Sequence, residues 1–68
     1  MSESLAEALP REQARVREVI AIYDGFPAGR LATTMMKSSL AKSEKAAASG
    51  DVAAMIAAYE ELKGYEPS

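Results

Sequence analysis

Two short stretches rich in helix-breaking residues divide this chain of 68 residues into three segments. The first is YDGFPAGR (23–30), which holds two glycines and a proline, and the second is ASGD (48–51). Glycine favours the end of a helix, aspartate caps the start of the next one, and proline suits the first helical turn. The two stretches therefore predict two corners that join three helices.

The first segment has apolar residues at helical spacing over residues 10–24. They make one stripe, which consists of Val16, Val19, Ile20 and Tyr23. Pro10 fits the first position of this helix, so residues 1–9 are expected to form a short N-terminal arm whose leucines dock on the core. Glu12 is then expected in the first turn, where a negative charge is favourable.

The second segment predicts a helix from near Pro27 to about Ser49. One side of it carries a series at helical spacing, mostly of small residues, which consists of Ala32, Met36, Ser39, Ser43 and Ala46. Small side chains at these positions let a neighbouring helix backbone approach closely. Gly25 is expected to end the preceding helix, and Phe26 is expected to pack on that helix or on Leu31.

The third segment predicts a helix that starts after Asp51 and ends before Gly64. Its apolar side consists of Val52, Met55, Ile56, Tyr59 and Leu62, and Tyr65 is expected to fold back after the glycine. The connection at 50–51 is short, so the second and third helices should be antiparallel neighbours. We therefore expect an all-α, small three-helix domain with a C-terminal antiparallel helical hairpin. Its parts are an arm over 1–9, a single helical domain over 10–64 and a tail over 65–68.

The composition limits how such a domain is stabilised and what chemistry it performs. Hydrophobic residues make up 49% of the chain, but 14 of them are alanines, and there is no cysteine and no histidine. Disulfides and the usual zinc shells are excluded, and the commonest catalytic base and the strongest nucleophile are missing. We expect a protein that is not an enzyme, uses no cofactor or metal, and depends on helix packing and self-association.

The charge and hydropathy patterns bear on location and on nucleic acid. The formal net charge is −2, which gives no global attraction to nucleic acid or to an anionic membrane. The third helix offers Glu60 and Glu61 where a recognition helix needs basic or amide side chains, so a DNA-binding regulator is only the second alternative. No segment resembles a signal peptide or a membrane span, and the expected location is the cytoplasm.

Four apolar residues are candidates for protein binding because they do not all fit one core stripe. They are Ile22, Met35, Met36 and Leu40. Ile22 lies off the main stripe, and adjacent methionines cannot both point into the same core. The alternative interpretation is that Ile22 flanks a wide stripe and that the methionines fill gaps between alanines. Surplus apolar surface predicts a homo-oligomer, most simply a dimer, and a protein partner.

The corner at 25–30 offers a second kind of site. Gly29, Arg30 and Thr33 stand at the start of the second helix, where free N–H groups, a guanidinium and a hydroxyl would attract a phosphate or carboxylate. A small-molecule or nucleotide binder that uses GFPAGR is therefore the first alternative function. No GxGxxG or GxxxxGK[ST] pattern supports it.

Three stretches, LPREQARVREVIAIY, PAGR and SGDVAAMIAAYEELKG, resemble short uncharacterised proteins of proteobacterial, Mu-like prophages. The resemblance covers about residues 9–64, and the SGDV turn with the following helix is its most specific part. No activity is established for that group, so no residue role is carried over. The resemblance implies a phage accessory protein that binds a host protein and inhibits or modulates it.

Overall fold

The computed structural model describes residues 3–65, which form three α-helices and one short 3-10 turn. α1 spans Leu5–Tyr23, η1 spans Pro27–Gly29, α2 spans Arg30–Ser49 and α3 spans Val52–Lys63. No strand occurs in the part of the chain that is described. The expected all-α domain of three packed helices is confirmed.

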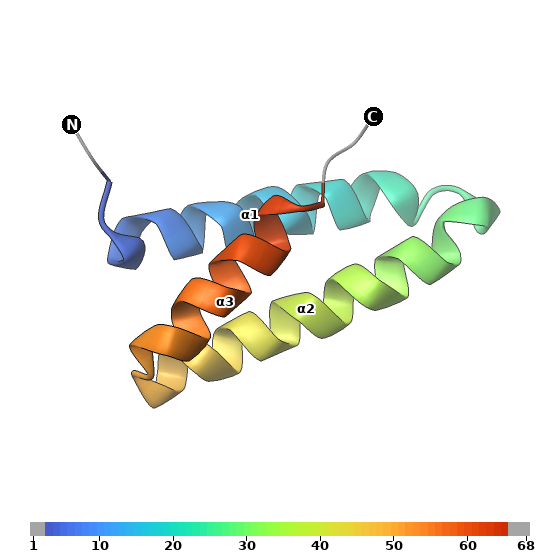
Figure 1. The fold of residues 1–68 in the computed structure, drawn as a ribbon. Helices are drawn as coiled ribbons and strands as arrows, with labels where there is room; N and C mark the ends of the chain where they lie inside the picture. Colours follow the sequence, from blue (N-terminus) through green and yellow to red (C-terminus); the bar gives the residue numbers. More distant parts are fainter. Residues whose placement is uncertain (1–2, 66–68) are drawn as a thin grey trace.

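The three helices pack against one another in a thin, flat arrangement. α1 and α2 diverge from the corner that joins them, and α3 turns back from the far end of α2 to lie against both (Figure 1). The Cα atoms extend over 36 × 26 × 14 Å. A domain this thin has two broad faces and a core only one or two side chains deep.

Six buried apolar side chains form the core, and α1 supplies most of them. They are Leu9, Val16, Val19, Ile20, Met36 and Leu62. The predicted stripe of α1 is confirmed, with Tyr23 packed at its edge. On α2 the predicted series of small residues is also confirmed, since Ser39, Ser43 and Ala46 are buried around Met36. These short side chains leave room for the other two helices to come close to α2.

A hydrogen bond between buried side chains joins α1 to α2. Nε2 of Gln13 donates to Oγ of Ser43 at 3.0 Å, and that hydroxyl donates to the carbonyl oxygen of Leu40 at 2.6 Å. An unpaired buried polar group costs about 1–3 kcal/mol. The pair therefore favours one register of α1 along α2.

The predicted start of the first helix at Pro10 is wrong, because α1 begins at Leu5 and includes the proline. The carbonyl oxygen of Ser4 accepts the N–H of Ala8 at 2.8 Å, so the helix is already formed before Pro10. Proline removes one hydrogen bond from a helix interior. Burial of Ala8 and Leu9 against the core offsets this loss.

The longer helix also changes the position of Glu12. It lies well inside α1 rather than in the first turn, and it is buried. Its Oε1 accepts a hydrogen bond from Nε of Arg15 at 3.1 Å. The expected interaction with the helix N-terminus is therefore replaced by an ion pair one turn away.

The corner between α2 and α3 has the predicted geometry. Gly50 has φ +72°, the left-handed conformation, and Oδ1 of Asp51 accepts the N–H of Ala54 at 3.2 Å. Gly64 follows the last residue of α3, and Tyr65 packs back on the core as expected. The local turn chemistry of ASGD thus determines where α2 ends and α3 begins.

The corner between α1 and α2 differs in two respects from its prediction. Pro27 opens η1 in the predicted role, but Gly25 does not have a positive φ, because the chain continues as a right-handed turn after Tyr23. Phe26 and Leu31 remain 61% and 74% exposed, so the expected packing of Phe26 does not bury either side chain.

Candidate protein-binding surface

The two adjacent methionines of α2 point in different directions, as the sequence predicts. Met36 is 1% exposed and lies in the core, whereas Met35 is 52% exposed. Successive helical residues are separated by about 100° around the helix axis, so only one of them reaches the α1–α2 contact. The prediction of Met36 as a protein-binding residue is therefore wrong, because its side chain is inside the domain.

The other two predicted binding residues differ in exposure. Ile22 is half-exposed on α1, and Leu40 is partly buried because it packs against the core cluster. Ile22 is therefore at the surface as predicted, and Met35 is the exposed one of the two methionines. Leu40 is shared between the core and the surface.

Two further apolar residues near the corner are exposed, although the sequence did not indicate them as candidates for protein binding. They are Phe26 and Leu31. Leu31 precedes Met35 by four residues, so both lie on one side of α2. This spacing is the sequence pattern that could have identified Leu31 as a surface residue. We call the group formed by Ile22, Phe26, Leu31 and Met35 the corner surface.

The corner surface is exposed because α3 is too short to cover it. α3 has 12 residues against 19 in α1 and 20 in α2, which corresponds to about 18 Å against about 28 and 30 Å at 1.5 Å per residue. The end of α3 lies beside the middle of α1 and of α2. Arg15 is hydrogen-bonded to the carbonyl oxygen of Leu62, and the hydroxyl of Ser39 is hydrogen-bonded to that of Tyr65. The last turns of α1 and the first turns of α2 extend past it toward the corner (Figure 1).

A hollow of about 420 Å³ lies at the edge of the corner surface, between α2 and the end of α3. Met35, Ser39 and Tyr65 are among its lining residues. The hydroxyl of Tyr65 is 2.8 Å from Oγ of Ser39 and donates to the carbonyl oxygen of Met35 at 3.3 Å. The apolar corner surface therefore has a polar margin, as protein interfaces generally do.

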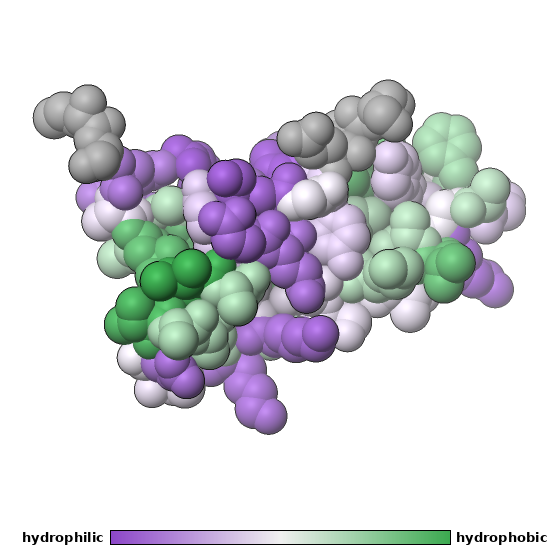
Figure 2. Space-filling model, viewed as in Figure 1, coloured by the Kyte–Doolittle hydropathy of each residue, from purple (hydrophilic) through white to green (hydrophobic). Residues whose placement is uncertain are grey.

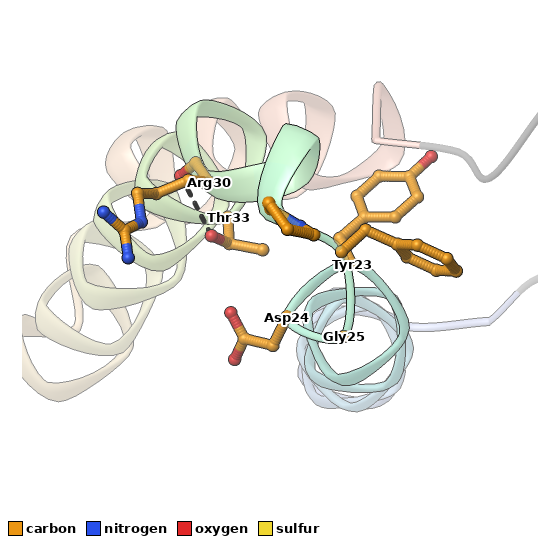
Figure 3. Close-up of a pocket in the computed structure, with 7 residues that line it drawn as sticks. Tyr23, Asp24, Gly25, Arg30 and Thr33 are labelled. Atoms are coloured by element: carbon orange, nitrogen blue, oxygen red, sulfur yellow. Dashed lines mark hydrogen bonds between the residues drawn. The ribbon is translucent and has the colours of Figure 1, made fainter.

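A second hollow, of about 340 Å³, lies at the corner itself and brings two of the predicted anion-binding residues together. Figure 3 shows Arg30 and Thr33 on its α2 side and Asp24 on its α1 side. The carboxylate of Asp24 is 3.5 Å from Nζ of Lys37. A carboxylate in the lining repels an anion, so the charges of this hollow are mixed rather than basic.

Two backbone N–H groups and the hydroxyl that were predicted to hold an anion already have partners within the protein. The N–H of Gly29 donates to the carbonyl oxygen of Phe26 at 3.0 Å, and the N–H of Arg30 donates to that of Pro27. The hydroxyl of Thr33 donates to the carbonyl oxygen of Arg30 at 3.0 Å. The 3-10 turn before α2 thus uses the N–H groups of Gly29 and Arg30, which an anion at this corner would need.

Gly29 has a structural role that the sequence did not reveal. A β-carbon at this position would lie 2.7 Å from the carbonyl oxygen of Tyr23 and 3.1 Å from its β-carbon. The chain passes so close to the end of α1 that only glycine fits. Packing of the corner, rather than access of a ligand, accounts for this glycine.

The acidic side chains are dispersed over the domain. In residues 3–65, no group of three or more acidic residues is placed so that it could hold a metal ion. None of the helices in the same range is long and apolar enough to cross a membrane. The corner surface is therefore the most distinctive surface feature of the described part of the chain.

No protein-family model, no curated protein and no solved structure gives a significant match to this chain.

Proposed function

We propose that the protein acts without catalysis, by binding another protein through the corner surface. The observation that supports this proposal is the exposure of four large apolar side chains beside one corner, compared with six in the core formed by residues 3–65. Exposed apolar groups of this kind on small soluble domains are typical of protein contacts. Met35 adds an adaptable side chain to the contact.

The setting of this function rests on the resemblance to short prophage proteins. An accessory protein of that kind would bind a bacterial host protein and inhibit or modulate it, and the domain would also form a homo-oligomer. The rigid helices on both sides of the corner hold the apolar groups in place before binding, which lowers the entropy cost of association.

Two other functions have less support. A nucleotide or phosphate binder would use the hollow at Arg30, but the nearby N–H groups are already bonded and Asp24 faces the same space. A DNA-binding regulator would need basic side chains on α3, where Glu60 and Glu61 are exposed instead. Protein binding therefore remains the function that the surface favours.

Photo-cross-linking tests the proposal at a single position. Leu31 is replaced by p-benzoylphenylalanine in bacterial cells, and the exposed Ala14 of α1, which is outside the corner surface, is replaced as a matched control. We expect covalent products from Leu31 and none, or only weak ones, from Ala14. Mass spectrometry identifies the captured protein.

The products separate the possible outcomes. A product with about twice the 7.2 kDa mass of the chain shows self-association, and a product with a foreign protein shows a host partner. If Leu31 gives no more product than Ala14, the corner surface is not a protein contact and the proposal fails.

A further inference from the structure

A second exposed apolar pair lies on α3, away from the corner. Val52 and Ile56 are 60% and 49% exposed, although the sequence placed them on the core side of this helix. They lie one turn apart, on the flank of α3 beside the core stripe of Met55, Tyr59 and Leu62. We call Val52 and Ile56 the α3 surface.

Apolar side chains gather at both ends of one broad face of the domain (Figure 2). Figure 2 shows apolar side chains over the first turns of α3 and again over the corner between α1 and α2. A band of hydrophilic side chains lies between these two regions. α2 and the last turns of α3 carry ion pairs, with Lys63 near Glu60 and Lys42 near Glu61.

The two surfaces belong to segments of opposite charge. Residues 23–45, which form the corner and most of α2, hold four basic residues and two acidic residues. Residues 51–65, which form α3 and its ends, hold three acidic residues and one basic residue. The corner surface is thus set in a basic segment, and the α3 surface is set in an acidic one.

We propose that two copies of this chain pack face to face, with the corner surface of each copy on the α3 surface of the other. This inference rests on the proposed function and names a second copy as the protein that occupies the corner surface. The two copies are related by a two-fold axis that lies in the plane of the contact. This rotation places the corner end of one copy over the α3 end of the other. One operation therefore creates both contacts, and the assembly closes as a dimer.

Charge complementarity favours this pairing over the contact of like surfaces. A dimer that joined two corner surfaces would bring two basic segments together, and a dimer that joined two α3 surfaces would bring two acidic ones together. Like charges across an interface are unfavourable, whereas opposite charges speed encounter and fix the orientation. The reciprocal arrangement places opposite segments in contact at both ends.

The face is large enough for such a contact. The Cα extents of 36 × 26 Å enclose a rectangle on the order of 900 Å², which is comparable with the roughly 800 Å² per partner that a stable interface buries. The exposed apolar side chains at both ends of this face (Figure 2) would become covered on each copy. The hydrophilic band would lie at the centre, where it meets the same band of the other copy.

Sedimentation equilibrium of the full chain with two charge variants tests the pairing. We expect Leu31→Glu and Ile56→Lys each to weaken dimerisation at least tenfold, and Ala14→Glu to leave it unchanged. An equimolar mixture of Leu31→Glu with Ile56→Lys can form a mixed dimer. In one of its contacts the altered corner surface meets the altered α3 surface, so opposite charges face each other, and the other contact is unchanged from the wild type. The mixture should therefore regain a dimer within a few-fold of the wild-type dissociation constant.

Several results would overturn the pairing. If Ile56→Lys alone dimerises like the wild type, the α3 surface takes no part. If the mixture stays monomeric while circular dichroism shows folded helices, the two surfaces do not meet. Met35→Glu and Val52→Lys repeat the test at neighbouring positions, so poor folding of one variant leaves the test intact. A monomeric wild type whose Leu31 cross-links only to a foreign protein would refute the dimer and retain the proposed function.

Discussion

Nη2 of Arg15 donates to the carbonyl oxygen of Leu62 at 2.8 Å, which joins the middle of α1 to the last turn of α3. Nη1 of the same guanidinium donates to the carbonyl oxygen of Tyr65 at 2.5 Å, and Nε pairs with Glu12. The last carbonyl groups of a helix have no partners within it, and a cation is favourable there. Arg15 therefore satisfies the end of α3 and neutralises a buried carboxylate.

Arg15→Met should lower the free energy of unfolding by about 2–3 kcal/mol, because it removes two charge-assisted hydrogen bonds and leaves Glu12 with only a distant cation. Urea unfolding followed by circular dichroism measures the change. Arg17→Met is the matched control, since Arg17 pairs with Glu44 on the exposed surface, where an ion pair contributes less than about 1 kcal/mol. Equal losses in the two variants would contradict the role of Arg15.

Gly29→Ala should lower the free energy of unfolding by about 1–3 kcal/mol, because the new β-carbon would overlap the backbone of Tyr23. At Gly25 a β-carbon would meet its nearest atom at an ordinary 3.5 Å, and φ is not positive there. Gly25→Ala should therefore be neutral or slightly stabilising. Thermal melting compares the two variants, and a loss at Gly25 as large as that at Gly29 would refute the steric explanation.

Gly50→Ala should cost about 1–2 kcal/mol for a different reason. No atom lies within 4 Å of a β-carbon at this position, so the cost comes from the left-handed backbone at φ +72° alone. Asparagine tolerates this conformation better than alanine. Unfolding free energies in urea should therefore fall in the order wild type, Gly50→Asn, Gly50→Ala, and a reversed order of the two variants would argue against backbone strain.

The adjacent methionines give a comparison at nearly the same place on α2. Met36→Ala should cost about 2–5 kcal/mol because it opens a cavity in the core. Met35→Ala should cost less than about 1 kcal/mol in the monomer, since its side chain is half-exposed. Unfolding is measured at low protein concentration, where association adds little. Similar costs at the two positions would mean that Met36 does not fill the core.

Dimerisation should weaken as salt is raised, because the proposed contacts join basic and acidic segments. The Debye length is about 10 Å at 0.1 M salt and about 3 Å at 1 M, so charges at the margin of an interface are increasingly screened. We expect a several-fold increase in the dissociation constant over this range in sedimentation experiments. Tighter association at 1 M salt would indicate a purely apolar contact.

The sequence predicts the corners well where local chemistry determines them, and less well where distant packing decides. Gly50 and Asp51 act within one turn of the chain, so ASGD predicts the end of α2 and the start of α3. Pro10 is a local signal for a helix start, but burial of Leu9 against the other helices overrides it. No local pattern reports such a contact.

The same limit applies to the candidate site. The 100° step between Met35 and Met36 shows that one of them must be exposed, but choosing between them requires the position of α1. Val52 and Ile56 look like core residues along α3, yet the thin core accepts only the neighbouring stripe that contains Leu62. The local sequence likewise does not show why residue 29 must be glycine, because this requirement comes from the close approach of its backbone to Tyr23.

The order in which the chain is made bears on how this domain reaches its fold. Leu62 fills the centre of the core, and the two hydrogen bonds from Arg15 reach across 47 and 50 residues. During synthesis, α1 and α2 emerge with their apolar sides unprotected until residues 62–65 are released from the ribosome. Final closure of the domain therefore waits for these residues, and a chain that stalls before Leu62 would be a target for chaperones and proteases.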